Sequence, residues 1–180
     1  MAGKLIAYFS GTGRTARMAN RLDEALGDAD VFVIEAAQPY TEADLDYTDK
    51  HSRTTIECAD PATRPELASL CTNLDDYDVI FLGMPIWWFK EAPIIRTFLE
   101  AHSWAGKTII PFVTSGSSGY GETSARMKEF APDATIVDGT RLRSSETVED
   151  LRQWAHNAMT GTRDADGQTK HARAATTALQ

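Results

Sequence analysis

The chain has little that could build a disulfide framework or a metal site. It contains 2 cysteines, Cys58 and Cys71, without Cys-x-x-Cys spacing, and its 4 histidines are scattered along the sequence. A disulfide-rich secreted fold needs several cysteines, and a zinc site needs clustered cysteine and histidine ligands. We therefore expect two free thiols, no metal ion and a reducing, cytoplasmic location.

Positive charge and long apolar runs are also scarce. Lys and Arg number 18 against 26 Asp and Glu, which gives a formal net charge of -8. That balance argues against sequence-independent nucleic-acid binding, which needs a basic surface, and suits a protein that meets partners with basic docking surfaces. No signal-peptide pattern precedes the first apolar segment, and no apolar run is long enough to span a bilayer. We expect no membrane segment.

Short apolar segments alternate with amphipathic stretches along most of the chain. Segments of strand length occur at residues 4–9, 31–34, 79–82, 108–113 and 135–137. They are apolar throughout rather than alternating, which is typical of a parallel sheet buried on both faces. Helical patterns between them complete a doubly wound α/β fold. The sequence thus predicts one domain over residues 1–160, followed by a flexible polar tail at 161–180.

Three local patterns within this domain stand out. A polar stretch from Glu35 to about Thr63 is too long for a passive connection and predicts a functional or mobile loop. Pro65 suits the first turn of a helix, which the spacing predicts next. The apolar face of that helix carries Leu67, Leu70, Cys71 and Leu74. Pro111 is unusual because it falls inside a predicted central strand, where proline cannot donate to the ladder.

The segment Ser10-Gly11-Thr12-Gly13-Arg14-Thr15 joins the first strand to a helical pattern. Free amides at a helix start and the helix dipole favour a bound anion, and the glycines allow close approach. The hydroxyls of Ser10, Thr12 and Thr15 add donors, whereas Arg14 either reaches the anion or lies in solvent. The segment predicts a phosphate site. A kinase-type P-loop is excluded because no lysine follows the second glycine.

Two phosphate ligands are compatible with this segment. Gly11, Gly13 and Ala16 fit the dinucleotide pattern G-x-G-x-x-[GA], and Glu35 stands where a ribose-binding acid would be. The hydroxyls favour a phosphomonoester, because a terminal phosphate has more free oxygens for short donors than a pyrophosphate cradled by glycine backbone.

Two later loops would lie beside this segment, at the carboxyl ends of the third and fourth strands. Trp87 and Trp88, in Pro85-Ile86-Trp87-Trp88, offer flat faces to a planar ring, although either indole could instead pack into the core. The second loop offers amides, hydroxyls and an aromatic ring to the polar edge of a heterocycle, although a plain glycine-serine loop has the same composition. Its candidate binding residues are Ser115, Gly116, Ser117, Gly119 and Tyr120.

Together these motifs resemble the flavodoxin family, specifically its short-chain, stand-alone branch. The resemblance covers residues 4–159 and includes the stretch Tyr40-Thr41-Glu42-Ala43-Asp44-Leu45-Asp46. It implies strand order 2-1-3-4-5 and the cofactor FMN, with its phosphate at residues 10–15. It further implies that residues 85–88 flank the isoalloxazine, that 115–120 cover its polar side, and that Tyr40 and Tyr47 close over the ligand.

The chain departs from this family at two positions. Arg14 stands where flavodoxins usually have asparagine, and Phe89 stands where relatives often have a small residue. The resemblance implies a carrier that shuttles single electrons between redox proteins. A flavin-dependent enzyme on this fold would need no catalytic acid, base or nucleophile, because the flavin carries the hydride chemistry. The alternatives are an NAD(P)H-dependent FMN oxidoreductase acting on quinones or similar acceptors, and a dinucleotide-binding protein.

Overall fold

The computed structural model describes residues 3–161 and has a central parallel sheet with strand order β2-β1-β3-β5-β6. These strands are β1 (Lys4–Tyr8), β2 (Ala29–Val33), β3 (Val79–Trp87), β5 (Thr108–Thr114) and β6 (Thr135–Ile136). They correspond to the five predicted strands, so the doubly wound α/β fold and the order 2-1-3-4-5 are confirmed.

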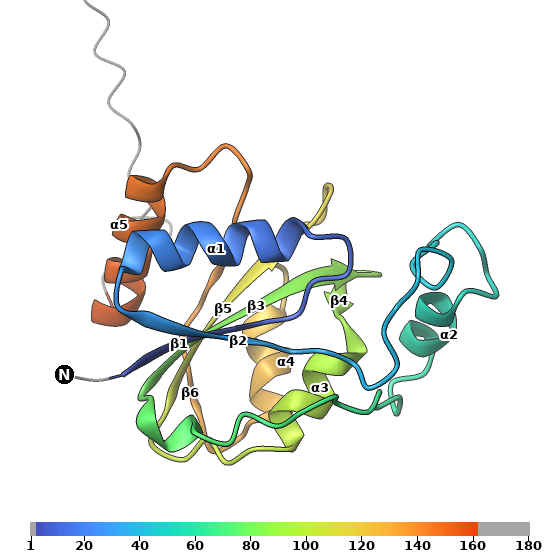
Figure 1. Ribbon diagram of the computed structural model, residues 1–180, viewed down its shortest axis with the longest axis horizontal. Coiled ribbons are helices and arrows are strands. Elements are labelled where there is room, and N and C mark those ends of the chain that lie inside the picture. Colours follow the sequence, from blue (N-terminus) through green and yellow to red (C-terminus); the bar gives the residue numbers. More distant parts are fainter. Residues whose placement is uncertain (1–2, 162–180) are drawn as a thin grey trace, which may run out of the picture.

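Helices cover both faces of the sheet. The helices α1 (Arg14–Leu26) and α5 (Val148–Thr160) lie on one face, and α3 (Pro93–Glu100) and α4 (Thr123–Phe130) lie on the other (Figure 1). Successive strand residues enter opposite cores: Leu5 belongs to the core under α3 and α4, and Ile6 to the core under α1 and α5. This two-sided burial explains why the strand segments are continuously apolar.

The edge strand β2 departs from the predicted burial. Val31 and Val33, on an edge strand that pairs only with β1 among the described strands, are 43% and 42% exposed. Expected burial on both faces was therefore wrong for this strand, although its position and parallel pairing with β1 were predicted correctly.

The helix predicted after Pro65 is absent from the described structure. Glu66 and Ala68 instead form backbone hydrogen bonds with Ala37 and Glu35 at 2.8 Å, and Leu67 pairs with Ala36 as an antiparallel bridge. This pairing with a distant segment overrides the local helical pattern. Between this pairing and β3, the only described helical element is the short 3-10 helix η1 (Leu74–Asp76).

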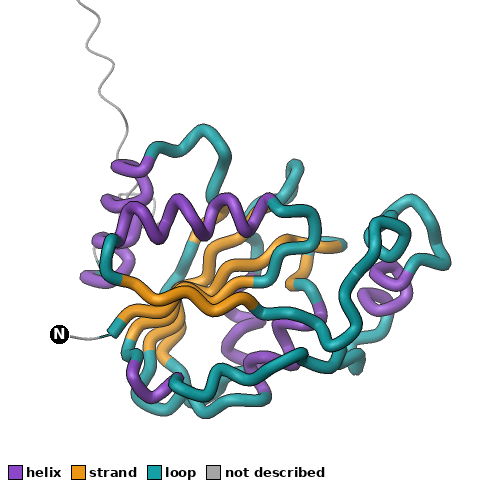
Figure 2. The backbone as a smooth tube through the Cα atoms, in the orientation of Figure 1, coloured by secondary structure: helices purple, strands orange, loops and turns teal. Residues whose placement is uncertain are grey.

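The predicted polar loop contains a helix of its own. The helix α2 (Arg53–Ala59) starts at Ser52, whose hydroxyl accepts a hydrogen bond from the Thr55 amide. Figure 2 shows the rest of this segment as loop, running outward to α2 and then back along the molecule. The prediction of a long loop was thus right in position but missed α2.

Pro111 lies in β5, at a point where the strand pairing along one side of β5 is interrupted between β6 and β7. Ile109 accepts from Val137 beyond β6, and Val113 accepts from Leu142 beyond β7 (Thr140–Arg141), so Pro111 faces the gap between the two short strands. Because residues 109, 111 and 113 face the same side of the strand, the missing proline amide falls where the ladder is broken. The strand β4 (Lys90–Glu91) completes the sheet as a hairpin with β3.

None of the helices in residues 3–161 is long and apolar enough to cross a membrane. The cytoplasmic location and the flexible tail stay predictions, and residues 162–180 lie outside the described part.

Candidate functional site

The carboxyl ends of β1, β3 and β5 open into a cleft of about 660 Å³. The cleft draws its walls from all three predicted loops and from the start of α1. Its lining residues are Gly11, Thr12, Arg14, Thr15, Arg17, Tyr47, Pro85, Ile86, Trp87, Thr114, Ser115, Gly116, Ser117 and Ser118. The topology therefore brings together most of the residues that were predicted from the sequence.

The start of α1 forms the anion-binding end of this cleft. Gly13 caps the helix with a left-handed φ of 91°, and the first helical bond runs from the Arg17 amide to the Gly13 carbonyl at 3.0 Å. The amides of Arg14, Thr15 and Ala16 precede that bond, so they have no carbonyl partner within the helix. Their position and the helix dipole favour a phosphate group.

The three hydroxyls near this helix start have different tasks. Ser10 Oγ accepts a hydrogen bond from the Gly13 amide at 3.0 Å, which shapes the turn and leaves the Ser10 proton available as a donor. Thr15 is buried, and its hydroxyl shares a 2.8 Å hydrogen bond with that of Thr114, which ties α1 to β5. Thr12 is exposed and lines the cleft.

Trp87 forms the aromatic wall of the cleft. Its indole packs edge-on against Phe9 at 5.5 Å and Tyr40 at 5.7 Å between ring centroids. A Cβ atom on Gly11 would lie only 3.1 Å from this indole, so the glycine allows the first loop and Trp87 to approach closely. The ring is therefore fixed by its neighbours before a ligand binds.

The neighbouring indole of Trp88 lies outside the cleft lining. Trp88 and Phe89 form the two-residue turn between β3 and β4, with left-handed φ values of 47° and 64°. Trp88 is 41% exposed and Phe89 is 85% exposed. The structure thus brings Pro85, Ile86 and Trp87 to the site and leaves Trp88 outside the cleft lining, in the turn to β4.

The third loop, at residues 115–120, likewise has some predicted residues in the cleft lining and others outside it. Ser115, Gly116 and Ser117 line the cleft, whereas Gly119 and Tyr120 do not. Tyr120 is partly buried, and burial raises its pKa to about 12. Its hydroxyl accepts from the Gly139 amide at 3.1 Å, so it anchors the connection between β6 and β7.

The segment before α2 is held against the aromatic wall. The Tyr40 hydroxyl donates to Glu57 at 2.6 Å, and burial, followed by this contact, raises the pKa of Tyr40. The Arg53 guanidinium lies 3.9 Å from the Tyr40 ring centre and pairs with Glu57 at 2.7 Å. These contacts anchor the segment, while Tyr47 reaches the cleft.

Arg17 also lines the cleft, although the sequence analysis did not single it out. Its spacing of three residues from Arg14 places both on one helix face and was the available signal.

Glu35 lies elsewhere, in a separate pocket of about 480 Å³ that also contains Gly11 and Gly13. The residues of the dinucleotide alternative thus meet at the edge between β1 and β2.

A family model described as flavodoxin matches residues 3–158 of this chain. The chain belongs to the flavodoxin family. The resemblance inferred from the three loops is therefore confirmed. No protein with a curated description matches the chain.

Solved structures support this membership. A protein from Bacteroides eggerthii, assigned as a flavoprotein, is 43% identical with a TM-score of 0.83, and the match covers 88% of this chain and 99% of that one. A similarly assigned protein from Bacteroides uniformis is 42% identical with a TM-score of 0.80, covering 86% and 98%.

A flavoprotein from Lactobacillus acidophilus, solved in complex with FMN, shares the fold at lower similarity. It is 21% identical with a TM-score of 0.60, and the match covers 78% of this chain and 93% of that one.

Proposed function

We propose that this flavodoxin-family chain holds FMN in the cleft at the ends of β1, β3 and β5 and acts as a single-electron carrier between redox proteins. The observation that carries the proposal is the meeting of a free helix start and a fixed indole in one cleft. The family membership and the FMN complex of the Lactobacillus acidophilus protein support FMN as the cofactor.

The described residues fit this cofactor at both ends. The amides at the start of α1 and the Thr12 hydroxyl would hold the phosphate, with Arg14 as a charged donor at the cleft wall. Trp87 would stack on the ring, and Ser115 to Ser117 would provide hydrogen-bond donors to its polar edge. FMN supplies the electron-accepting and electron-releasing chemistry when bound.

The ionisable groups of the cleft are compatible with a carrier. Among the residues that line it, the only ionisable side chains are those of Arg14, Arg17 and Tyr47. The described lining therefore holds no carboxylate or imidazole, and a carrier needs none because FMN supplies the redox chemistry.

The proposed partners have basic docking surfaces. Glu42, Asp44, Asp46 and Asp49 are in the segment before α2, beside the cleft residue Tyr47. This acidic segment, together with the net charge of -8, would steer a basic partner toward the cofactor.

A coulometric reduction of the FMN-loaded protein tests this function. We expect two separated one-electron steps, and negligible NADPH oxidation when the protein is mixed with NADPH and a quinone. A single two-electron step with rapid NADPH oxidation would instead identify an NAD(P)H-dependent oxidoreductase. A protein that takes up no FMN would contradict both functions.

A further inference from the structure

A second, strongly basic pocket adjoins the cofactor cleft. It has a volume of about 690 Å³ and lies between α1, the end of β5 and the loop that leads from β7 to α5. Five arginines contribute to it, and none of its lining residues within the described chain is acidic. These arginines are Arg14, Arg17, Arg21, Arg141 and Arg143.

The ion pairs of the molecule separate these five arginines from the others. Every arginine of residues 3–161 outside the pocket forms an ion pair with a glutamate, namely Arg53, Arg64, Arg96, Arg126 and Arg152. None of the five pocket arginines pairs with a described carboxylate. In a chain with a net charge of -8, five guanidinium groups without a described carboxylate partner around one concavity make it a favourable site for an anion.

Two of these arginines are fixed in place by backbone carbonyls. Arg21 donates to the carbonyls of Ser144 and Glu146, and Arg141 donates to those of Ser115 and Gly116. These bonds orient the side chains without neutralising them. The buried Nε of Arg141 has no hydrogen-bond partner, which leaves one donor unused.

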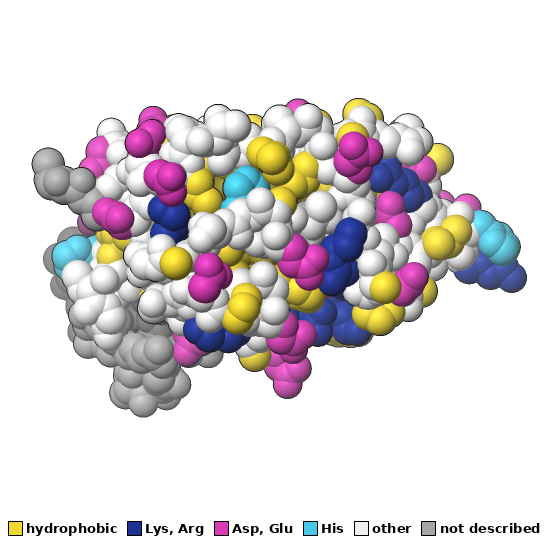
Figure 3. Space-filling view, turned by 90° about the horizontal axis from the view of Figure 1, so that it is seen from below, with side chains coloured by type: hydrophobic (Ala, Val, Ile, Leu, Met, Phe, Trp, Pro, Cys, Tyr) yellow, Lys and Arg dark blue, Asp and Glu magenta, His cyan; other side chains and the backbone are white. Residues whose placement is uncertain are grey.

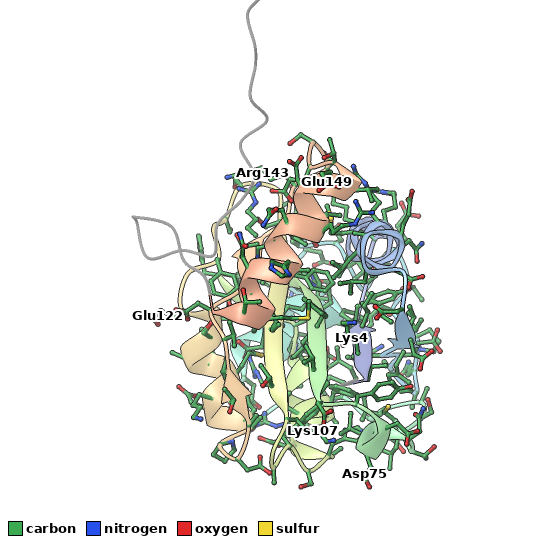
Figure 4. The ribbon with its side chains drawn as sticks, turned by 90° about the vertical axis from the view of Figure 1, so that its left-hand side faces the viewer. Lys4, Asp75, Lys107, Glu122, Arg143 and Glu149 are labelled. Atoms are coloured by element: carbon green, nitrogen blue, oxygen red, sulfur yellow. The ribbon has the colours of Figure 1, made fainter. Side chains whose placement is uncertain are left out.

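Arg14, Arg17 and Arg143 form no hydrogen bond through their side chains within the described chain. The Glu146 carboxylate accepts a hydrogen bond from the backbone amide of Arg143. Figure 4 places Arg143 on the loop before α5, at the opposite end of the view from Lys107. Three guanidiniums are thus free to bind a ligand from α1 and from this loop.

One phosphomonoester cannot neutralise this group. A phosphate carries at most about two negative charges, and the FMN phosphate belongs at the start of α1 in the adjoining cleft. The two concavities share Arg14, Arg17 and Thr114 to Gly116 as a common wall, whereas Arg21, Arg141 and Arg143 line only the basic pocket. Space and charge therefore remain for a second ligand.

We propose that this basic pocket binds a small ligand with a pyrophosphate group, next to the FMN phosphate. Guanidinium groups match phosphate oxygens in bidentate geometry, and the pocket volume is typical of a small-molecule site. The ligand is either inorganic pyrophosphate or a nucleotide that carries this group. The proposal rests on FMN occupying the adjoining cleft, but it does not depend on whether the protein carries single electrons.

Calorimetric titration of the FMN-loaded protein with inorganic pyrophosphate tests the proposal. We expect one site per chain, with bound FMN retained, and weaker binding of inorganic phosphate. Arg143→Ala should weaken pyrophosphate binding by about tenfold or more, because it removes a charge-assisted contact, while FMN affinity stays unchanged. Lys50→Ala is the matched control, since it removes one exposed positive charge outside the pocket.

Several results of this titration would overturn the proposal. No binding to the FMN-loaded protein, displacement of FMN by pyrophosphate, or equal weakening by Arg143→Ala and Lys50→Ala would overturn the proposal. Arg143→Glu provides a second variant, which should abolish binding if the pocket is the site. Parallel titration with adenosine diphosphate distinguishes the two sources, because tighter binding than pyrophosphate identifies a nucleotide.

Discussion

At the scale of single residues, two adjacent tryptophans have opposite surroundings. Trp87 ends β3 and packs against Phe9 and Tyr40 beside the cleft. Trp88 follows it with a left-handed backbone in the turn to β4, outside the cleft lining. The sequence alone could not separate them, because the turn that reverses the chain after Trp87 depends on pairing with β4.

Trp87→Ala should weaken FMN binding and brighten the fluorescence of the bound flavin. Loss of a stacking contact is worth about 0.5–1.5 kcal/mol, or about a twofold to tenfold rise in Kd. Fluorescence titration of the apoprotein with FMN measures both effects. Trp88→Ala removes the same side chain outside the cleft lining and should leave the Kd near the wild-type value. An equal loss in both variants would contradict the stacking role.

Gly139→Ala should destabilise the fold. A Cβ atom there would lie 1.5 Å from the Pro111 carbonyl oxygen, so the backbone between β6 and β7 must shift. We expect the free energy of unfolding to fall by about 1–3 kcal/mol in urea titrations. Gly119→Ala is the control, since a Cβ at Gly119 meets nothing within 4 Å. Coincident unfolding midpoints for the two variants would exclude this close approach.

At the scale of elements, the sequence patterns correctly predicted those helices that interactions close in the sequence stabilise. The helices α1, α3 and α5 follow apolar stripes, and α5 starts at a capping box formed by Thr147 and Asp150. The helix expected after Pro65 failed because Leu67 pairs with Ala36, about thirty residues away. A single sequence carries no signal for that distant pairing.

The same limit applies to the candidate site. The three loops were predictable because parallel strands bring their carboxyl ends to one edge. The fixing of Tyr40 by Glu57 and Arg53 depends on α2, which the polar composition of that segment concealed. Whether Tyr120 lines the cleft depends on its contact with the β6–β7 connection. Whether Trp88 lines it depends on the turn from β3 to β4.

Glu91 connects three elements, so Glu91→Gln should destabilise them together. The buried Glu91 carboxylate, in β4, accepts from Arg96 of α3 at 2.7 Å and from Arg126 of α4 at 2.8 Å. Removing its charge leaves the buried Arg96 without its counterion, which costs about 3 kcal/mol. Urea denaturation at neutral pH measures this loss. Glu24→Gln removes the same charge from an exposed position on α1 and should have little effect.

The Glu91 carboxylate should also make the free energy of unfolding depend on pH. Burial raises the pKa of Glu91, but hydrogen bonds from Arg126 and Arg96 outweigh burial and hold the pKa below its usual value of 4.5. Its stabilisation is therefore complete above that value and is lost as the pH falls through the lower folded pKa. Unfolding measured below pH 4.5 should show a steeper loss of stability in wild type than in Glu91→Gln. Parallel curves would contradict this linkage.

The turn between β3 and β4 should become more stable when its strain is relieved. Phe89 has a φ of 64° and is 85% exposed, so its side chain gains little from packing. Phe89→Gly should raise the free energy of unfolding by about 1 kcal/mol, because glycine adopts this conformation without a Cβ clash. Phe89→Ala keeps the Cβ atom and should show no such gain. Thermal unfolding of the apoprotein compares the two.

At the scale of the whole molecule, charge is distributed unevenly around the cleft. The unpaired arginines lie on the α1 and α5 side, whereas Glu42, Asp44, Asp46 and Asp49 lie on the side of the segment before α2. The face shown in Figure 3 has acidic and basic side chains intermingled. The cleft therefore has a basic rim and an acidic rim, and a partner of either sign meets an oriented field.

This arrangement predicts where charge reversal slows electron transfer. Glu42→Lys should lower the rate constant for electron transfer from the FMN-loaded protein to a small basic haem protein, because Glu42 lies on the acidic rim. Stopped-flow measurement at low ionic strength should show a several-fold decrease that disappears when the Debye length falls to about 3 Å at 1 M salt. Glu24→Lys changes the net charge equally but lies on α1, outside the cleft lining, and should retain most of the rate. If both variants slow the reaction equally, net charge rather than the acidic rim steers the partner; if neither does, the partner docks elsewhere.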